Sequence, residues 1–168
     1  MSATFTVRRA TPQDEAGVSE LLLASYPGSM RTAYDQAVLE GALPLITRAN
    51  PALLSCGTYY LAVNDDDLAV GCGGWSRELP GGCEVTPELA HIRHFATHPE
   101  WLRRGIGRKL YRRCEEDARS FGVRRFECQA SLNAEGFYVA LGFRAVRRIE
   151  LRIGPGPMLP CILMERAI

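Results

Sequence analysis

Short blocks of hydrophobic positions, separated by polar turns, divide the chain into predicted strands and helices. Apolar runs with strand composition occupy positions 5–10, 58–63, 68–75, 91–98, 125–130, 143–153 and 158–166. Helical spacing of apolar positions occupies 11–28, 34–48, 108–121 and 133–141. Because strands and helices mix without strict alternation, this order predicts an α/β fold with a mixed sheet and helices on both faces.

Proline residues set the predicted limits of the first two helices. Thr11 and Pro12 suit the start of the first helix, and Tyr26-Pro27-Gly28 is expected to end it. The second helix contains Pro44, which predicts a break or kink because its ring displaces a backbone hydrogen bond. The side chains expected to point inward from this helix are Val38, Leu39 and Leu45.

A hairpin is predicted from 58–63 and 68–75, joined by the turn at 64–67. Its second strand contains three glycines, Gly71, Gly73 and Gly74. Glycines inside a strand predict a bulge or the close approach of another backbone.

The stretch from His91 to Arg108 has the form of a strand, a basic glycine turn and the start of a helix. The free amides at the start of a helix, together with its dipole, favour a bound phosphate. Gly105 and Gly107 allow close approach of the backbone. Arginines add positive charge to the turn, at Arg103, Arg104 and Arg108.

Two better-known phosphate loops do not fit this turn. A dinucleotide-binding fingerprint would need a third glycine where Leu110 stands, and the Gly-Lys-Ser/Thr of a P-loop is absent. The segment Leu102-Arg103-Arg104-Gly105-Ile106-Gly107 resembles the acetyl-CoA pyrophosphate loop of GNAT N-acetyltransferases, with the pattern Gln/Arg-x-x-Gly-x-Gly/Ala. Leu102 departs from that pattern, which weakens one side-chain contact but leaves the backbone amides untouched. A tight turn with exposed arginines is the alternative explanation.

A second motif, Ser131–Phe143, is similar to the GNAT segment in which Asn-Ala precedes Phe-Tyr and then Gly-Phe. Asn133 suits the cap of the helix that follows. Phe137 and Leu141 are expected to dock this helix, with Tyr138 on a different face. Tyr138 would be a half-buried structural tyrosine if the motif had no catalytic role.

The resemblance implies a specific fold and cofactor. The GNAT fold is a mostly antiparallel seven-stranded sheet whose strands 4 and 5 splay apart, with acetyl-CoA in the gap. Backbone at Phe95, Ala96 and Thr97 would pair with the pantetheine arm, as an added strand would. The amides from Arg104 to Arg108 would bind the pyrophosphate. Asn133 is carried over as a further cofactor-binding residue.

The family's reaction is direct acetyl transfer from the thioester to an amine, which requires a base, an oxyanion donor and a proton for the thiolate. Tyr138 matches the family's proton donor. His91 occupies a strand position where several GNAT enzymes carry Glu or His, and it is the candidate base. A chain of water molecules competes with it. His94 has the opposite strand parity unless a bulge intervenes, and His98 is interpreted as structural.

The acceptor site is expected to be walled by the segment from 26 to 52, by Trp75 and by the last hairpin. The residues proposed to hold a cation there are Tyr34, Asp35, Glu40 and Trp75. The sequence leaves the amine open among small molecules and peptides.

Composition limits the alternatives. A chain of 168 residues with net charge +1 is expected to form a single domain, residues 1–168, that binds neither nucleic acid nor membrane. Six cysteines without Cys-x-x-Cys spacing predict no metal site, and the lack of a signal peptide predicts reduced thiols in the cytoplasm. A homodimer is left open.

The favoured function is an acetyl-CoA-dependent N-acetyltransferase acting on a primary amine of a small molecule or peptide. The main alternative is a catalytically idle acyl-CoA-binding or regulatory module of the same fold. A nucleotide-binding protein is disfavoured because both phosphate-loop fingerprints fail.

Overall fold

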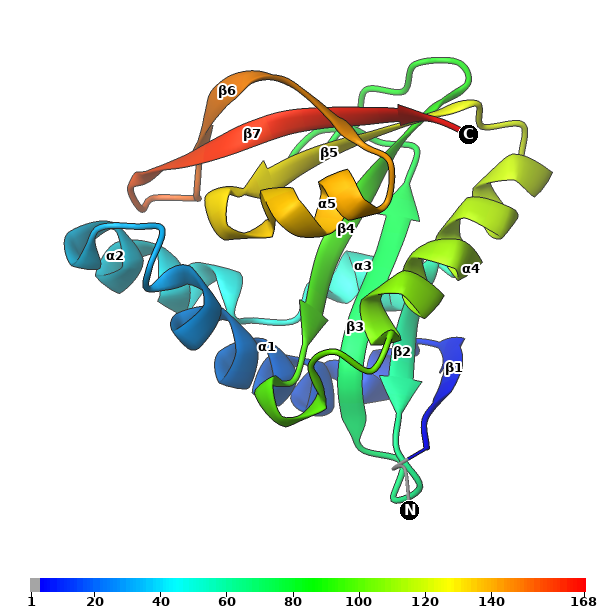
Figure 1. The fold of residues 1–168 in the computed structure, drawn as a ribbon, viewed down its shortest axis with the longest axis horizontal. Helices are drawn as coiled ribbons and strands as arrows, with labels where there is room; N and C mark the ends of the chain where they lie inside the picture. Colours follow the sequence, from blue (N-terminus) through cyan, green and yellow to red (C-terminus); the bar gives the residue numbers. More distant parts are fainter. Residues whose placement is uncertain (1–3) are drawn as a thin grey trace.

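A seven-stranded sheet in the order β1-β2-β3-β4-β5-β7-β6 forms the centre of the molecule (Figure 1). The computed structural model describes residues 4–168. The strands are β1 (Thr6–Arg9), β2 (Tyr59–Val63), β3 (Ala69–Ser76), β4 (Leu89–Thr97), β5 (Arg125–Ser131), β6 (Arg144–Arg152) and β7 (Met158–Ala167). Within this region β4 and β5 pair in parallel and the other neighbours pair antiparallel. The predicted mixed, mostly antiparallel sheet is confirmed.

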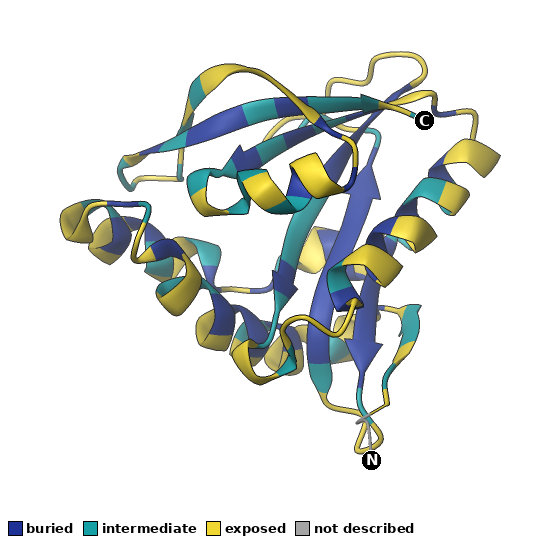
Figure 2. Cartoon of the chain, viewed as in Figure 1, coloured by how far each residue is buried: buried dark blue, intermediate teal, exposed yellow. Residues whose placement is uncertain are grey.

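Helices cover both faces of this sheet, as predicted. They are α1 (Glu15–Met30), α2 (Gln36–Ile46), α3 (Pro51–Ser55), α4 (Ile106–Ser120) and α5 (Glu135–Ala140). One core lies between the sheet and the α4 and α5 side, and a second lies between the sheet and α1 and α3. Figure 2 shows β2 and β3 as buried strands between these helices, whose outer faces are exposed.

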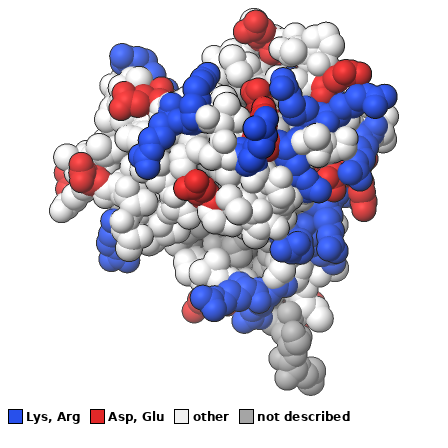
Figure 3. Space-filling view, turned by 45° about the horizontal axis from the view of Figure 1, so that its top comes forward, with Lys and Arg blue, Asp and Glu red and all other residues white. Residues whose placement is uncertain are grey.

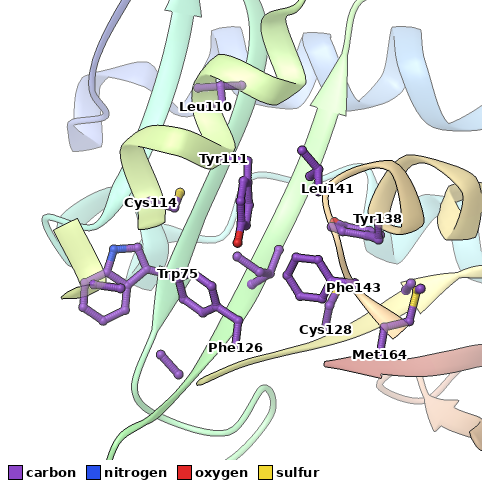
Figure 4. Close-up of a cluster of buried hydrophobic side chains, with 14 of the residues drawn as sticks. Trp75, Leu110, Tyr111, Cys114, Phe126, Cys128, Tyr138, Leu141, Phe143 and Met164 are labelled. Carbon is purple, nitrogen blue, oxygen red and sulfur yellow. The ribbon is translucent and has the colours of Figure 1, made fainter. Parts of the chain in front are cut away.

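The larger core is aromatic and lies under α4 and α5 (Figure 4). Tyr111 packs edge-on against Phe126 and Phe143, with ring centroids 6.1 and 5.6 Å apart. Tyr138 reaches the same cluster through Phe143, at 5.5 Å. One end of this core therefore supports the tyrosine that the second motif singled out.

The helices differ from the prediction in several details. α1 continues through Pro27 to the buried Met30, because one missing N–H removes a single hydrogen bond while the apolar face stays buried. α2 runs through Pro44 without the break that was one of the two predicted outcomes, and Leu45 is exposed rather than inward. The short α3 was not predicted, although Asn50, whose side chain accepts from the Ala52 amide, and Pro51 are helix-start signals.

The glycines of β3 lie beside a bulge and beside another backbone, as predicted: the register with β2 shifts between Ala62 and Val63, next to Gly71, and a Cβ on Gly74 would lie 2.5 Å from the Thr58 carbonyl oxygen. The register between β3 and β4 shifts so that His94 and Phe95 lie opposite Gly73, which defines a bulge in β4. A Cβ on Gly73 would lie 2.6 Å from the Phe95 ring, and one on Gly71 would collide with Ile106. Glycine at these positions lets a ring and a helix approach the sheet.

The predicted splay between the fourth and fifth strands is confirmed. β4 and β5 pair at Leu89, Ala90 and His91, and no pairing is assigned within residues 4–168 between the two strands beyond His91. β5 instead continues along β7 through Ser131. A gap therefore opens along β4 from Ile92 onward.

Surface charge is mixed. Lys and Arg side chains gather over large parts of the face in Figure 3, while Asp and Glu side chains are more scattered there. The net charge of the chain is nevertheless only +1.

Candidate active site

A cavity of about 330 Å³ lies where β4 and β5 separate. Its floor comes from the β4 bulge and from Cys128 to Ser131 of β5. Its walls come from α1, the end of α2, the loop after β3 and the hairpin between β6 and β7. The predicted walls from 26–52 and the last hairpin are thus present.

Three side chains from the α1-facing core hold the bulge of β4. The Tyr59 hydroxyl donates to the His94 carbonyl at 2.9 Å, and the Cys72 thiol donates to the same oxygen at 3.4 Å. The Tyr26 hydroxyl donates to the Phe95 carbonyl at 3.2 Å. His94 has φ +46°, which is uncommon for a non-glycine residue. The bulge is therefore a fixed feature of the cavity.

The bulge brings His94, rather than His91, to the cavity. Burial, with a smaller contribution from Arg93, lowers the pKa of His94 to about 4, so its imidazole is neutral at pH 7. His91 is only 4% exposed and does not line the cavity; its Nδ1 lies 3.9 Å from Glu127 Oε2. Burial lowers the pKa of His91 despite the opposing charge of Glu127. A base role for His91 would require a relay.

Tyr138 lines the cavity from α5. Its side chain is 5% exposed, and its ring packs edge-on against Phe95 and Phe137 with centroids 6.4 and 5.0 Å apart. Burial, and then the neighbouring Cys128 thiol, raise its pKa well above the usual range for tyrosine. The phenol therefore keeps its proton at neutral pH, as an acid must.

The glycine turn ends at the N-terminus of α4. Gly105 has φ +77° and a Cβ there would meet open space, so its conformation is what requires glycine. Lys109 donates the first backbone bond to the Gly105 carbonyl at 3.0 Å. The amides of Ile106, Gly107 and Arg108 precede that bond and are the free donors of the first turn.

All three arginines of this turn, Arg103, Arg104 and Arg108, are exposed. Arg104 in addition lies 4.6 Å over the Trp101 ring and donates to the Glu100 carbonyl. Ile106 is buried in the core, so only its backbone can serve a ligand.

Gly107 was expected to let a phosphate approach the backbone. A Cβ on Gly107 would instead lie 2.7 Å from the Phe137 ring. The absence of a side chain at Gly107 therefore makes room for the Phe137 ring of α5, and phosphate binding by the Gly107 amide stays a prediction.

Asn133 does not cap α5, contrary to the prediction. It lies exposed in the 3₁₀ turn Leu132–Ala134, and α5 begins later, at Glu135. A cofactor contact of Asn133 stays a prediction.

The four residues predicted to hold a cation lie outside the cavity lining. The Tyr34 hydroxyl donates to the Pro160 carbonyl and accepts from the Leu132 amide, and Trp75 donates to Asp117 on the α4 side. Asp35 is exposed at the start of α2, and Glu40 accepts from Gln36. None of the four therefore lines this cavity.

Sequence reasoning missed Tyr26, Tyr59 and Arg93. The two tyrosines anchor carbonyls of the bulge, and Arg93 lines the cavity beside His94. The glycines of β3 were the available signal for a bulge, but nothing in the sequence showed which side chains would reach it.

Comparison with known proteins places this geometry in a family. The model described as the acetyltransferase (GNAT) family matches residues 18–143, three quarters of the chain. The chain belongs to the GNAT acetyltransferase family. Both motifs of this GNAT chain, the α4 turn and Tyr138, flank the gap between β4 and β5.

Solved structures share the fold of this GNAT chain. A structure described as "GCN5-related N-acetyltransferase: aminotransferase, class-II" from Rhodopseudomonas palustris matches with 21% identity and TM-score 0.79, covering 100% of this chain and 99% of that one. PaiA N-acetyltransferase from Thermoplasma acidophilum, in complex with coenzyme A, matches with 15% identity and TM-score 0.71, covering 98% and 99%.

N-acetylglutamate synthase from Neisseria gonorrhoeae, complexed with coenzyme A and N-acetyl-glutamate, matches with 16% identity and TM-score 0.64. The match covers 99% of this GNAT chain and 36% of that protein. A search of curated protein sequences found no match.

Three further observations concern residues 4–168 of this GNAT chain. No set of three or more His, Cys, Asp or Glu side chains there is grouped so as to hold a metal ion. No helix there combines the length and apolar character needed to cross a membrane. The six cysteines carry free thiols.

Proposed function

We propose that this protein is an acetyl-CoA-dependent N-acetyltransferase that moves the acetyl group directly to a primary amine of a small molecule or peptide. The observation that carries the proposal is that the protonated phenol of Tyr138, the neutral imidazole of His94 and the β4 bulge face one cavity. The coenzyme A complexes among the structural neighbours support the choice of cofactor.

The chain's own groups suit the cofactor. The free amides at the start of α4 and the exposed Arg103 and Arg108 would bind the pyrophosphate. The unpaired side of β4 at Phe95, Ala96 and Thr97 would take the amide-containing pantetheine arm. When bound, acetyl-CoA supplies the activated acetyl group as a thioester.

The reaction requires proton transfers at the amine and at the thiolate. The acceptor ammonium would lose one proton to a base, and its neutral nitrogen would form a bond to the acetyl carbon. As the carbon–sulfur bond breaks, Tyr138 would give its proton to the departing thiolate and would regain one from the acylated nitrogen, directly or through water. A backbone amide of the bulge would stabilise the oxyanion of the tetrahedral intermediate.

His94 is the base that the cavity favours, acting directly or through one water molecule. Its place in the cavity lining supports this choice over His91. Activity of His94→Gln and His91→Gln, measured side by side, separates them: loss in the His91 variant alone would return the role to His91.

The test of the proposed function is a thiol-release assay with acetyl-CoA across an amine panel, with product masses measured. An acetylated amine and stoichiometric free coenzyme A are expected. Binding of acetyl-CoA without transfer to any amine would instead support the idle module.

A further inference from the structure

The wall of the acceptor cavity contains an arginine without an ionic partner. We infer that the acceptor is an amine that also carries a carboxylate, which the Arg93 guanidinium binds. This inference rests on the proposed function and names the substrate class of the same site.

Most N–H donors of the Arg93 guanidinium are available to a ligand. The guanidinium donates to Ser76 Oγ at 2.9 Å, and this is the one side-chain hydrogen bond assigned to it within residues 4–168. No carboxylate in that region lies within 4.0 Å of it, although Arg8, Arg119, Arg124, Arg125, Arg144 and Arg166 all form ion pairs there. A guanidinium has five N–H donors and binds a carboxylate in bidentate fashion.

Arg93 is also half-buried, and burial lowers the pKa of its guanidinium from its usual value. A half-buried cation without an ion pair leaves its desolvation cost uncompensated. An anionic ligand in the cavity would compensate it.

The remaining charges of the cavity have the same sign. Arg152, from the end of β6, is the second charged residue of the lining, and the lining residues within 4–168 include no Asp or Glu. Two carboxylates lie nearby but outside the lining. Glu127 is beside His91 and Arg125, and Glu78 raises the pKa of Arg93 from beyond ion-pair distance. This distribution disfavours polyamines and other polycationic acceptors.

The rest of the wall is largely apolar. Met30 of α1, Ile46 of α2, and Leu151, Ile153 and Leu159 of the last hairpin face the same space. An acceptor that matches both parts of the wall has an apolar body, one amine and one carboxylate. Apolar amino acids have this chemistry.

The experiment compares matched acceptors that differ only in charge. Leucine, methionine and phenylalanine are each assayed beside their amides and their decarboxylated amines, with wild type, Arg93→Gln and Arg93→Lys. A charge-assisted hydrogen bond contributes about 1.5–3 kcal/mol, so wild type should prefer the carboxylate by about 10- to 100-fold in kcat/KM. Arg93→Gln should abolish the preference, and Arg93→Lys should keep part of it.

Two controls guard against a folding defect. Arg147→Gln, on exposed β6, should retain the preference, and the melting temperature of Arg93→Gln should show that this variant is folded. Equal or better turnover of amides and amines by wild type would overturn the inference and leave the acetyltransferase function intact.

If no amine is acetylated, a binding experiment distinguishes the carboxylate preference of the cavity from the proposed acetyltransferase function. Binding of N-acetylphenylalanine and of its amide to the coenzyme A-loaded protein is measured by calorimetry. An Arg93-dependent preference for the carboxylate supports the inference although the proposed function fails. Equal affinity, or no binding of either compound, overturns it.

Discussion

At the scale of single residues, Tyr138 is held where a phenol keeps its proton. Replacing it with Phe preserves the ring that packs on Phe95, Phe137 and Phe143. We expect Tyr138→Phe to lower turnover by about 10²- to 10⁴-fold, because general acid catalysis contributes that much. Acetyl-CoA affinity and melting temperature should change little.

Tyr111→Phe is the matched control. Tyr111 is also buried in the aromatic core, its hydroxyl accepts from Arg166 at 2.9 Å, and it does not line the cavity. This variant should lose some stability and keep its turnover. Full turnover in Tyr138→Phe, with acetyl transfer rate-limiting, would assign Tyr138 to packing alone.

His94 makes stability depend on pH. Its pKa is about 4 in the folded protein and about 6.5 in an unfolded chain, so the unfolded state binds its proton first as pH falls. The free energy of unfolding is therefore not reduced by His94 above pH 6.5. It falls as the pH drops from 6.5 to 4, because the unfolded chain takes up a proton there and the folded protein does not.

We therefore expect His94→Gln to lose less stability than wild type on acidification, by about 1–2 kcal/mol between pH 7 and pH 5. Urea unfolding at the two pH values measures this difference. Parallel losses in both proteins would mean that the buried environment does not shift the titration of His94.

At the scale of elements, Gly107 joins α4 to α5. The Phe137 ring lies where a Cβ on Gly107 would be, at 2.7 Å. Gly107→Ala should therefore destabilise the protein by about 1–3 kcal/mol, the usual cost of overpacking. The double variant Gly107→Ala/Phe137→Leu should recover part of this loss in chemical denaturation.

Gly105→Ala tests a glycine that is required by its backbone conformation and not by a close contact. A Cβ there meets open space, so the cost should be backbone strain alone, about 1 kcal/mol. Because that strain comes from the backbone, Phe137→Leu should not relieve it. Equal rescue of both variants would contradict a specific contact between Gly107 and Phe137.

Element-level patterns made much of the fold predictable. The glycines of β3 predicted a bulge, and hydrophobic spacing predicted the strands and the helices that flank the glycine turn. The end of α1 was not predictable from Pro27, because tertiary burial of Met30 outweighs one lost hydrogen bond. Asn133 likewise is a residue type that caps helices, but it lies one residue before the N-cap position of α5, which is Ala134.

The cavity was less predictable than the fold. Strand parity placed His94 on the opposite face unless a bulge intervened, and the observed bulge of one residue does reverse the alternation beyond it. The charge of the acceptor wall was also missed. The sequence contains many arginines, and only the three-dimensional arrangement distinguishes the unpaired Arg93 from those that form ion pairs.

At the scale of the whole molecule, two parts of one sheet meet at β4 and β5. They share register pairs at Leu89, Ala90 and His91, and then diverge around the cavity. A cofactor in the gap would contact both parts. Acetyl-CoA at 100 times its Kd should therefore stabilise the fold by about 2.7 kcal/mol, a rise in melting temperature of about 5–10 °C.

Gly105→Asp is the control for this measurement. It places an anion at the start of α4, where the pyrophosphate is expected, and should abolish the rise in melting temperature. Arg147→Gln, on exposed β6, should leave the rise unchanged. A full rise in the folded Gly105→Asp variant would remove the α4 turn from the cofactor site.

The gap also gives this sheet an open edge in its interior. The outer edges are protected against joining another chain: β1 is four residues long, and β6 carries Arg144, Arg147, Arg148 and Arg152. Along the gap, we expect the bulge at His94 to hinder the free edge of β4 from pairing with another chain. The bulge interrupts the regular spacing of donors and acceptors along β4, so a peptide strand in regular register would pair poorly there, whereas a short amide-containing arm would need only a few contacts. The same irregularity that brings a histidine to the cavity would therefore disfavour aggregation through the gap.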